Sequence, residues 1–217
     1  NGDYQPTSGQ YLINGEEVRF KSPHEAIEAG VSVIYQERQI LLELNVAENI
    51  YLGRMPVTRL GVIDKRAANR QAQRIIEDFG LPIHPADKVK DLSVAYQQMV
   101  EIMKAYSREN LKVICFDEPS ASLSDSEIES LFSIIRKLKS EDKIIIYVSH
   151  RMSEIFQITD RVAVFKDGRY VDTVNTKDTN EQTLIKMMVG RDLGNIYTSL
   201  DRTKEIGDVL LEVSHLS

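Results

Sequence analysis

Residues 113–118 read Val-Ile-Cys-Phe-Asp-Glu, and the rest of the chain can be placed around this stretch. Its four apolar residues are typical of a strand that is buried on both faces of a parallel sheet. Asp117 and Glu118 follow at once, and ligands of an open α/β sheet bind beyond the carboxyl ends of its strands. The first carboxylate suits a hard cation, and the second suits proton abstraction. The alternative is a strand that ends at solvent, where acidic residues are common.

The composition is that of a globular protein with a substantial core. Hydrophobic residues make up 42% of the 217 residues, which argues against a disordered chain. Lys and Arg number 27 against 33 Asp and Glu, and the net charge of −6 argues against a nucleic-acid partner. No apolar run approaches the roughly 18 residues of a membrane span. The only cysteine, Cys115, lies in the apolar run and is expected to be a small buried hydrophobe.

Turn and capping residues divide the rest of the chain into short elements. The predicted elements are a hairpin over 10–20, a helix over 22–30, a strand over 31–35, helices over 45–52, 64–80 and 93–106, a strand over 113–116, a helix over 124–138, a strand over 144–148, a helix over 153–158, strands over 162–165 and 170–174, a helix over 179–190 and a strand over 209–213. The predicted capping residues are Ser22 with Glu25, Asp64, Ser93, Ser124 with Glu127, and Thr179.

This order predicts an α/β fold with a mostly parallel sheet, an N-terminal antiparallel hairpin and an inserted all-helical subdomain. We expect four parts: residues 1–36 and 107–190 form the sheet-bearing core, residues 37–106 form the helical subdomain, and residues 191–217 form a linker with a further strand.

Three of the predicted strands end at residues with useful polar chemistry. Gln36 follows the first, Asp117 and Glu118 follow the second, and His150 follows the third. Because the carboxyl ends of parallel strands share one edge, we expect these side chains to converge. Together they fit phosphoryl transfer, in which Asp117 holds Mg²⁺, Glu118 polarises the attacking water, Gln36 touches metal or water, and His150 steadies the γ-phosphate. Taken singly, each could be an ordinary turn or loop residue.

Ser93 adds a helix N-terminus to this picture. Free N–H groups and a partial positive charge at that end of a helix suit a phosphate. The alternative is an ordinary helix cap.

Five segments resemble, in order, the motifs of the ATP-binding cassette (ABC) ATPases. Tyr35-Gln36-Glu37, Leu92–Gln98, Val113–Pro119, Ala121-Ser122-Leu123 and Ser149–Met152 are similar to the Q-loop, signature, Walker B, D-loop and switch histidine of that family. Further similarity points to the first cassette of sugar importers of the ribose and galactose type, which carry two cassettes on one polypeptide. It lies in Tyr4–Gly9, Lys21–Pro23, Gln97–Ile102 and Ser149–Ile155, and residues 208–217 resemble the start of a second cassette.

The resemblance implies a RecA-like P-loop NTPase core that uses ATP and Mg²⁺. It implies catalytic roles for Glu118, His150 and Gln36, and metal contacts from Asp117 and Gln36. The implied nucleotide-binding residues of the signature segment are Ser93, Val94, Ala95, Tyr96 and Gln97, which close on the ATP held by another cassette.

The implied partners are transmembrane sugar permease subunits, a second cassette and, indirectly, an extracytoplasmic sugar-binding protein, with no nucleic acid. The implied location is the cytoplasm, peripheral on the inner face of the membrane. The alternative is a non-transport or non-hydrolysing cassette that acts as a nucleotide-dependent scaffold. Retention of both Asp117 and Glu118 weighs against a dead site.

Several positions depart from the family pattern. The sequence has no Gly-Lys pair and therefore no phosphate loop of the type G-x-x-x-x-G-K-[ST], which in the family precedes the segment matching Tyr4–Gly9. We therefore expect a truncated core that neither binds ATP tightly nor turns it over, with a gap in the sheet beside Val113–Phe116. In the signature, Val94, Ala95 and Tyr96 replace two glycines and a glutamine, and Ser124 replaces the D-loop acid.

Overall fold

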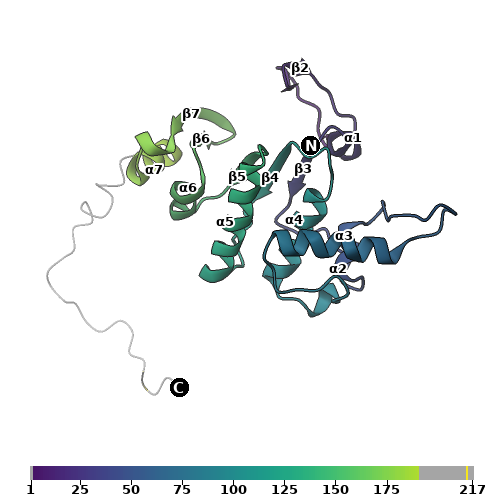
Figure 1. Cartoon of the computed structure of the whole chain (residues 1–217). Coiled ribbons are helices and arrows are strands. Elements are labelled where there is room, and N and C mark those ends of the chain that lie inside the picture. Colours follow the sequence, from purple (N-terminus) through teal and green to yellow (C-terminus); the bar gives the residue numbers. More distant parts are fainter. Residues whose placement is uncertain (1, 191–213, 215–217) are drawn as a thin grey trace. The chain divides into compact units, whose positions relative to one another are not determined.

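The structure of this protein is a computed structural model that describes residues 2–190 and Ser214. The chain divides into two compact units, one that ends at Ile158 and one that begins at Thr159. Figure 1 labels the elements of each. The predicted linker and the predicted strand over 209–213 lie outside the described residues.

A three-stranded parallel sheet lies at the centre of the first unit. It consists of β3 (Val31–Ile34), β4 (Val113–Asp117) and β5 (Ile144–Val148), in the order β3-β4-β5. Figure 1 shows the three strands side by side. Both pairings are parallel, with Ile34 opposite Phe116 and Phe116 opposite Tyr147. The parallel sheet expected from the apolar runs is therefore confirmed.

The sheet corrects two expectations about the central strand. β4 is hydrogen-bonded to a strand on each side, so the gap predicted beside Val113–Phe116 is wrong. The prediction that the strand is buried on both faces is also wrong. Ile114 and Phe116 are fully buried, but Cys115 on the other face is only half-buried, and Ile146, its partner in β5, is 49% exposed. A continuous apolar run shows that both faces can be covered, but not that they are covered.

The N-terminal hairpin and first helix form as their turn and cap residues dictate. β1 (Leu12–Ile13) pairs antiparallel with β2 (Glu16–Glu17) across Asn14 and Gly15, which both have positive φ. α1 (Pro23–Glu28) is capped by Ser22. The Glu25 carboxylate, however, accepts a hydrogen bond from the N–H of Lys21 and not from that of Ser22, so the predicted reciprocal box is displaced by one residue.

Gly30 joins α1 to β3 in a conformation that requires glycine. Its φ is +97°, and a Cβ atom there would lie 2.2 Å from the backbone oxygen of Asn110. Its own carbonyl oxygen accepts hydrogen bonds from the N–H groups of Lys112 and Val113. This close approach sets the start of β3 against the start of β4.

The helical insert shares its core with the sheet. It contains α2 (Val46–Ile50), α3 (Lys65–Asp78), the 3₁₀ turn η1 (Val89–Asp91) and α4 (Val94–Tyr106). Its buried residues form one hydrophobic cluster with those of β4 and α5 (Asp125–Ser140). Asn45, Asp64 and Ser93 cap these helices by accepting hydrogen bonds from backbone N–H groups. The proposed boundaries at 36/37 and 106/107 stay predictions.

Two helices follow the strands that carry the candidate site. α5 begins with the predicted capping box, because the Glu127 carboxylate accepts the N–H of Ser124 at 2.9 Å. α6 (Met152–Ile158) begins two residues after His150. Among the helices that the structure describes, none is both long and apolar enough to cross a membrane.

The second unit holds a strand pair and a helix. β6 (Arg161–Lys166) pairs antiparallel with β7 (Arg169–Asn175) across Asp167-Gly168, and the 3₁₀ turn η2 (Thr176–Asp178) leads to α7 (Glu181–Val189). The cap of α7 is Asn180 and not the predicted Thr179, because the Asn180 side chain accepts the N–H of Thr183. Gly190 ends α7 in the left-handed conformation.

Candidate active site at the carboxyl edge of the sheet

The strand register brings the predicted polar residues to one level of the sheet. Ile34, Phe116 and Tyr147 are opposite one another. Two residues further along each strand stand Gln36, Glu118 and Ser149, and His150 is the next residue after Ser149. The ends of β3, β4 and β5 therefore meet at one edge, as parallel pairing requires.

Glu118 and His150 are in direct contact. His150 Nδ1 lies 3.0 Å from Glu118 Oε1, within hydrogen-bonding distance. The side chain of His150 is 68% exposed and that of Glu118 is 35% exposed, so solvent reaches the pair. The backbone N–H of Glu118 donates to the carbonyl oxygen of Val148 at 3.0 Å, which fixes the end of β4 against β5.

The backbone of Glu118 is strained. Its φ of +46° lies in the left-handed region, where a residue with a Cβ atom pays on the order of 1–2 kcal/mol. The turn that follows is closed by a hydrogen bond from the N–H of Ala121 to the Glu118 carbonyl oxygen at 3.3 Å. Strain of this kind is frequent at functional sites, because it aims a side chain that the regular strand would not present.

Asp117 and Gln36 offer oxygen donors suited to Mg²⁺. Asp117 is the last residue of β4 and is half-buried, and Gln36 is exposed just beyond β3. In the part of the chain that the structure describes, no group of three or more His, Cys, Asp or Glu side chains could hold a metal ion. A site for Mg²⁺ with nucleotide needs only one or two protein carboxylates, since phosphates and water complete the shell, so these donors fit.

Within the signature segment, the structure presents some residues to solvent and buries others. Ser93 caps α4 by accepting the N–H of Tyr96, and its hydroxyl lies 3.5 Å from Glu127 Oε1. Ser93 and Val94 are exposed, and Tyr96 packs partly buried against the core. Ala95 is buried. Gln97 is also buried, and its amide donates to the carbonyl oxygens of Val89 and Leu92 at 3.1 Å each.

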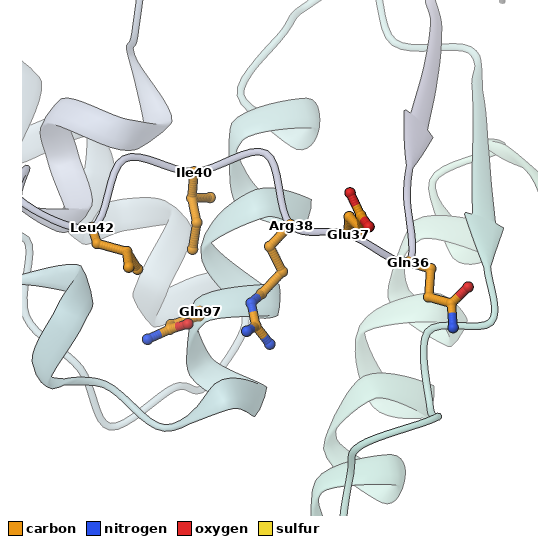
Figure 2. Close-up of a pocket in the computed structure, with 6 residues that line it drawn as sticks. All are labelled: Gln36, Glu37, Arg38, Ile40, Leu42 and Gln97. Atoms are coloured by element: carbon orange, nitrogen blue, oxygen red, sulfur yellow. The ribbon is translucent and has the colours of Figure 1, made fainter.

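A pocket of about 390 Å³ runs along the segment after Gln36. Its lining residues are Gln36, Glu37, Arg38, Ile40, Leu42 and Gln97. Figure 2 shows Gln36 at the end of this segment nearest the sheet and Leu42 at the end nearest the helices, with the side chains of Arg38 and Ile40 pointing toward the side where Gln97 lies. The pocket therefore connects the candidate site to the helical insert.

Two side chains of α4 hold the backbone of this segment at Gln39. Glu101 Oε1 accepts the N–H of Gln39 at 3.3 Å, and Lys104 Nζ donates to its carbonyl oxygen at 3.3 Å. Glu101 is only 5% exposed, and burial raises the pKa of its carboxyl group. Sequence patterns do not reveal this pair, because nothing in them shows that Glu101 is buried among the mostly apolar residues of α4.

The family model described as ABC transporter matches residues 1–121, which is 121 of the 217 residues. The chain belongs to the ABC transporter family. The matched residues include Gln36, Asp117 and Glu118 of the carboxyl edge, and His150 follows them in the chain.

Curated relatives match nearly the whole chain. The arabinose import ATP-binding protein AraG of Mannheimia succiniciproducens is 46% identical over 219 aligned residues, which cover 100% of this chain and 43% of the relative. The protein of the same name from Yersinia pestis is 48% identical over 91% of this chain and 38% of its own length. The chain thus spans about two fifths of the length of these relatives.

Solved structures of ABC proteins share the fold. The structure of cbiO1 from Clostridium perfringens superposes with a TM-score of 0.69 at 18% identity, covering 85% of this chain and 72% of that one. A nucleotide-free ATP-binding cassette from an ABC transporter superposes with a TM-score of 0.70 at 21% identity, covering 88% and 76%. The predicted α/β fold class is confirmed.

Proposed function

We propose that this chain is part of an ATP-hydrolysing subunit, called the whole protein below, that powers monosaccharide import by an ABC transporter. The observation that carries the proposal is the 3.0 Å contact between Glu118 and His150. It lies at the edge of the sheet where Gln36 and Asp117 stand at the ends of their strands. An amide, two carboxylates and an imidazole at one strand edge can hold a metal ion, accept a proton from water and contact a phosphate, which are parts of phosphoryl transfer to water.

Each residue has a distinct proposed role. Glu118 accepts a proton from the attacking water, because it is the carboxylate that extends beyond the strand and remains partly exposed. His150 Nδ1 donates to Glu118 and orients it, and when the ring is protonated on both nitrogens its Nε2–H can also donate to an oxygen of the γ-phosphate. Gln36 positions the water or the metal. Asp117 and Gln36 would hold Mg²⁺, which when bound neutralises charge on the phosphates.

The N-terminus of α4 is proposed to meet the nucleotide held by another cassette. Ser93 and Val94 are the members of the signature segment that face solvent, and the free N–H groups of a 13-residue helix favour a phosphate there. Ala95, Tyr96 and Gln97 would contribute indirectly, by holding the start of α4 in place. The Gln97 amide, for example, binds the carbonyl oxygens of Val89 and Leu92 in the turn just before Ser93.

The relatives guide the choice of sugar and partners. Because the AraG proteins are named for arabinose import, we propose arabinose as the transported sugar. The proposed partners are transmembrane permease subunits, a second cassette and, indirectly, an extracytoplasmic sugar-binding protein. The proposed location is the cytoplasmic face of the membrane.

The pocket after Gln36 is the proposed contact with the permease. It is lined by both apolar and charged side chains, and its segment is tied to α4 through Gln39. A movement of the permease would therefore reach both Gln36 and the helix that carries Ser93.

Replacing Leu42 with aspartate is expected to reduce sugar transport at least about tenfold while basal ATP hydrolysis changes little. Leu42 is 47% exposed in the pocket, and a buried charge at an interface removes binding free energy. The measurement is uptake of labelled arabinose, together with ATPase activity, in proteoliposomes that contain the whole transporter. Leu12→Asp is the matched control, because Leu12 is 51% exposed and lies outside the pocket. Equal transport by both variants would place the permease contact elsewhere. If the permease does not stimulate ATP hydrolysis, the alternative of a scaffold cassette is favoured.

The 217-residue chain by itself is expected to bind ATP with a Kd well above the micromolar range and to show no measurable turnover. Its sequence has no Gly-Lys pair, and the backbone N–H groups and lysine of a phosphate loop supply most of the phosphate cradle. Isothermal titration with ATP and Mg²⁺ tests this. A micromolar Kd would show that these 217 residues suffice for binding.

A further inference from the structure

We propose that Glu154 is a positioning residue that holds the loops bearing Glu118 and His150 at their working separation. This role rests on the function proposed above. Glu154 would touch neither the nucleotide nor the attacking water and would act through its neighbours.

Glu154 is a buried charge at the centre of a hydrogen-bond network. It lies in α6 and is 3% exposed. Its Oε2 accepts from the hydroxyl of Tyr147 at 2.9 Å and from that of Ser149 at 3.0 Å. Its Oε1 accepts from Arg151 Nη1 at 3.3 Å, and the hydroxyl of Ser120 also hydrogen-bonds to this carboxylate. A buried carboxylate is tolerated only when its oxygens are satisfied in this way.

The donors come from both catalytic loops. Ser120 is two residues after Glu118 and is itself buried, with 2% of its surface exposed. Ser149 and Arg151 flank His150, and the Ser149 hydroxyl accepts the N–H of Arg151 at 3.0 Å. Tyr147 anchors the network to β5. One carboxylate therefore ties the turn after Glu118 to the turn that carries His150.

The network requires the charged form of Glu154. Burial by itself raises the pKa of a carboxyl group, but the hydrogen bonds from Ser120, Tyr147 and Ser149 outweigh burial, and the pKa of Glu154 is lowered. Both oxygens of an ionised carboxylate accept hydrogen bonds, which suits a site where four side chains donate. A glutamine of the same shape replaces one acceptor by a donor and would face hydroxyls and a guanidinium that also donate.

Glu154→Gln in the whole protein is expected to lower kcat for ATP hydrolysis about 10- to 100-fold. KM and the Kd for ATP should stay within about threefold of wild type, because misplaced catalytic groups slow the chemical step without weakening binding. Hydrogen exchange is expected to quicken at the amides of residues 118–121 and 149–151. Glu129→Gln is the matched control, since Glu129 accepts a hydrogen bond from Gln157 of α6 on an exposed surface. It should leave both measurements unchanged.

A double-substitution test distinguishes positioning from general support of the fold. Tyr147→Phe and Ser149→Ala each remove one donor and leave the carboxylate with its others. Each should lower kcat modestly in wild type and have no further effect in the Glu154→Gln background, because coupled residues are not additive. If Glu154→Gln does not fold, these two single variants decide the question by their kcat and exchange.

A folded Glu154→Gln protein with wild-type kcat, or fully additive effects, would overturn the proposal. If the whole wild-type protein, and not only the 217-residue chain, shows no ATP hydrolysis, the proposed function fails and hydrogen exchange alone decides the role of Glu154. Faster exchange at both loops would then support the link between them, and unchanged exchange would overturn it.

Discussion

Replacing Glu118 with glutamine is expected to lower ATP turnover by the whole protein about 10²- to 10⁴-fold and to leave ATP binding intact. The amide keeps the size of the side chain and an oxygen that can accept from His150 Nδ1, which lies 3.0 Å from Oε1 in the native site. It loses the basicity needed to take a proton from water. The loss should therefore appear in kcat and not in the Kd for ATP.

The measurement is steady-state ATP hydrolysis together with equilibrium binding of ATP and Mg²⁺. Glu109→Gln is the control, because Glu109 is an exposed glutamate that precedes the amino end of β4, whereas Glu118 follows its carboxyl end. Undiminished turnover in Glu118→Gln would remove Glu118 from the mechanism and leave its strained backbone without a catalytic explanation.

Replacing Phe116 with alanine is expected to lower the free energy of unfolding by about 3–5 kcal/mol. Phe116 is fully buried in β4, and its ring centroid lies 6.3 Å from that of Tyr147 in β5. Removing the ring leaves a cavity directly before Asp117 and Glu118. Because whole domains are stable by only about 5–15 kcal/mol, the loss should be plain in chemical denaturation followed by circular dichroism.

Cys115→Ala is the matched control on the same strand. Cys115 points to the opposite face and is half-buried, so its truncation should cost much less. Similar losses for the two variants would mean that the second face of the sheet is as well packed as the first. That result would contradict the exposure of Ile146.

Local sequence signals predicted most of the elements. Asn14-Gly15, Asp64 and the Ser124/Glu127 pair each act on backbone groups within a few residues, and the structure has the expected turn or cap at each. At α7 the cap is Asn180, one residue after the predicted Thr179, because the Asn180 side-chain oxygen accepts the N–H of Thr183. Which of two adjacent polar residues caps a helix depends on their backbone angles, and these cannot be read from the sequence.

The candidate site was predictable in part. The residues that end the strands could be named because each follows an apolar run, and parallel pairing then brings Gln36, Glu118 and His150 to one edge. Their catalytic roles stay predictions. Glu101 and Glu154 were missed, since a glutamate among apolar residues gives no sign of whether it is buried or solvated. The signal that could have found Glu154 is its position four residues after His150, in the first turn of the helix that follows the same loop.

By itself the sequence determined the α/β order of elements, the strands and the polar residues at their ends, because these depend on periodicity and on contacts between near neighbours. Only the tertiary structure decided that Glu118 and His150 touch, that one face of the sheet is open at Ile146, and that Glu154 joins two loops. Each of these depends on strand register and on packing between distant segments. A one-residue shift of register would separate the same side chains, and the sequence would read no differently.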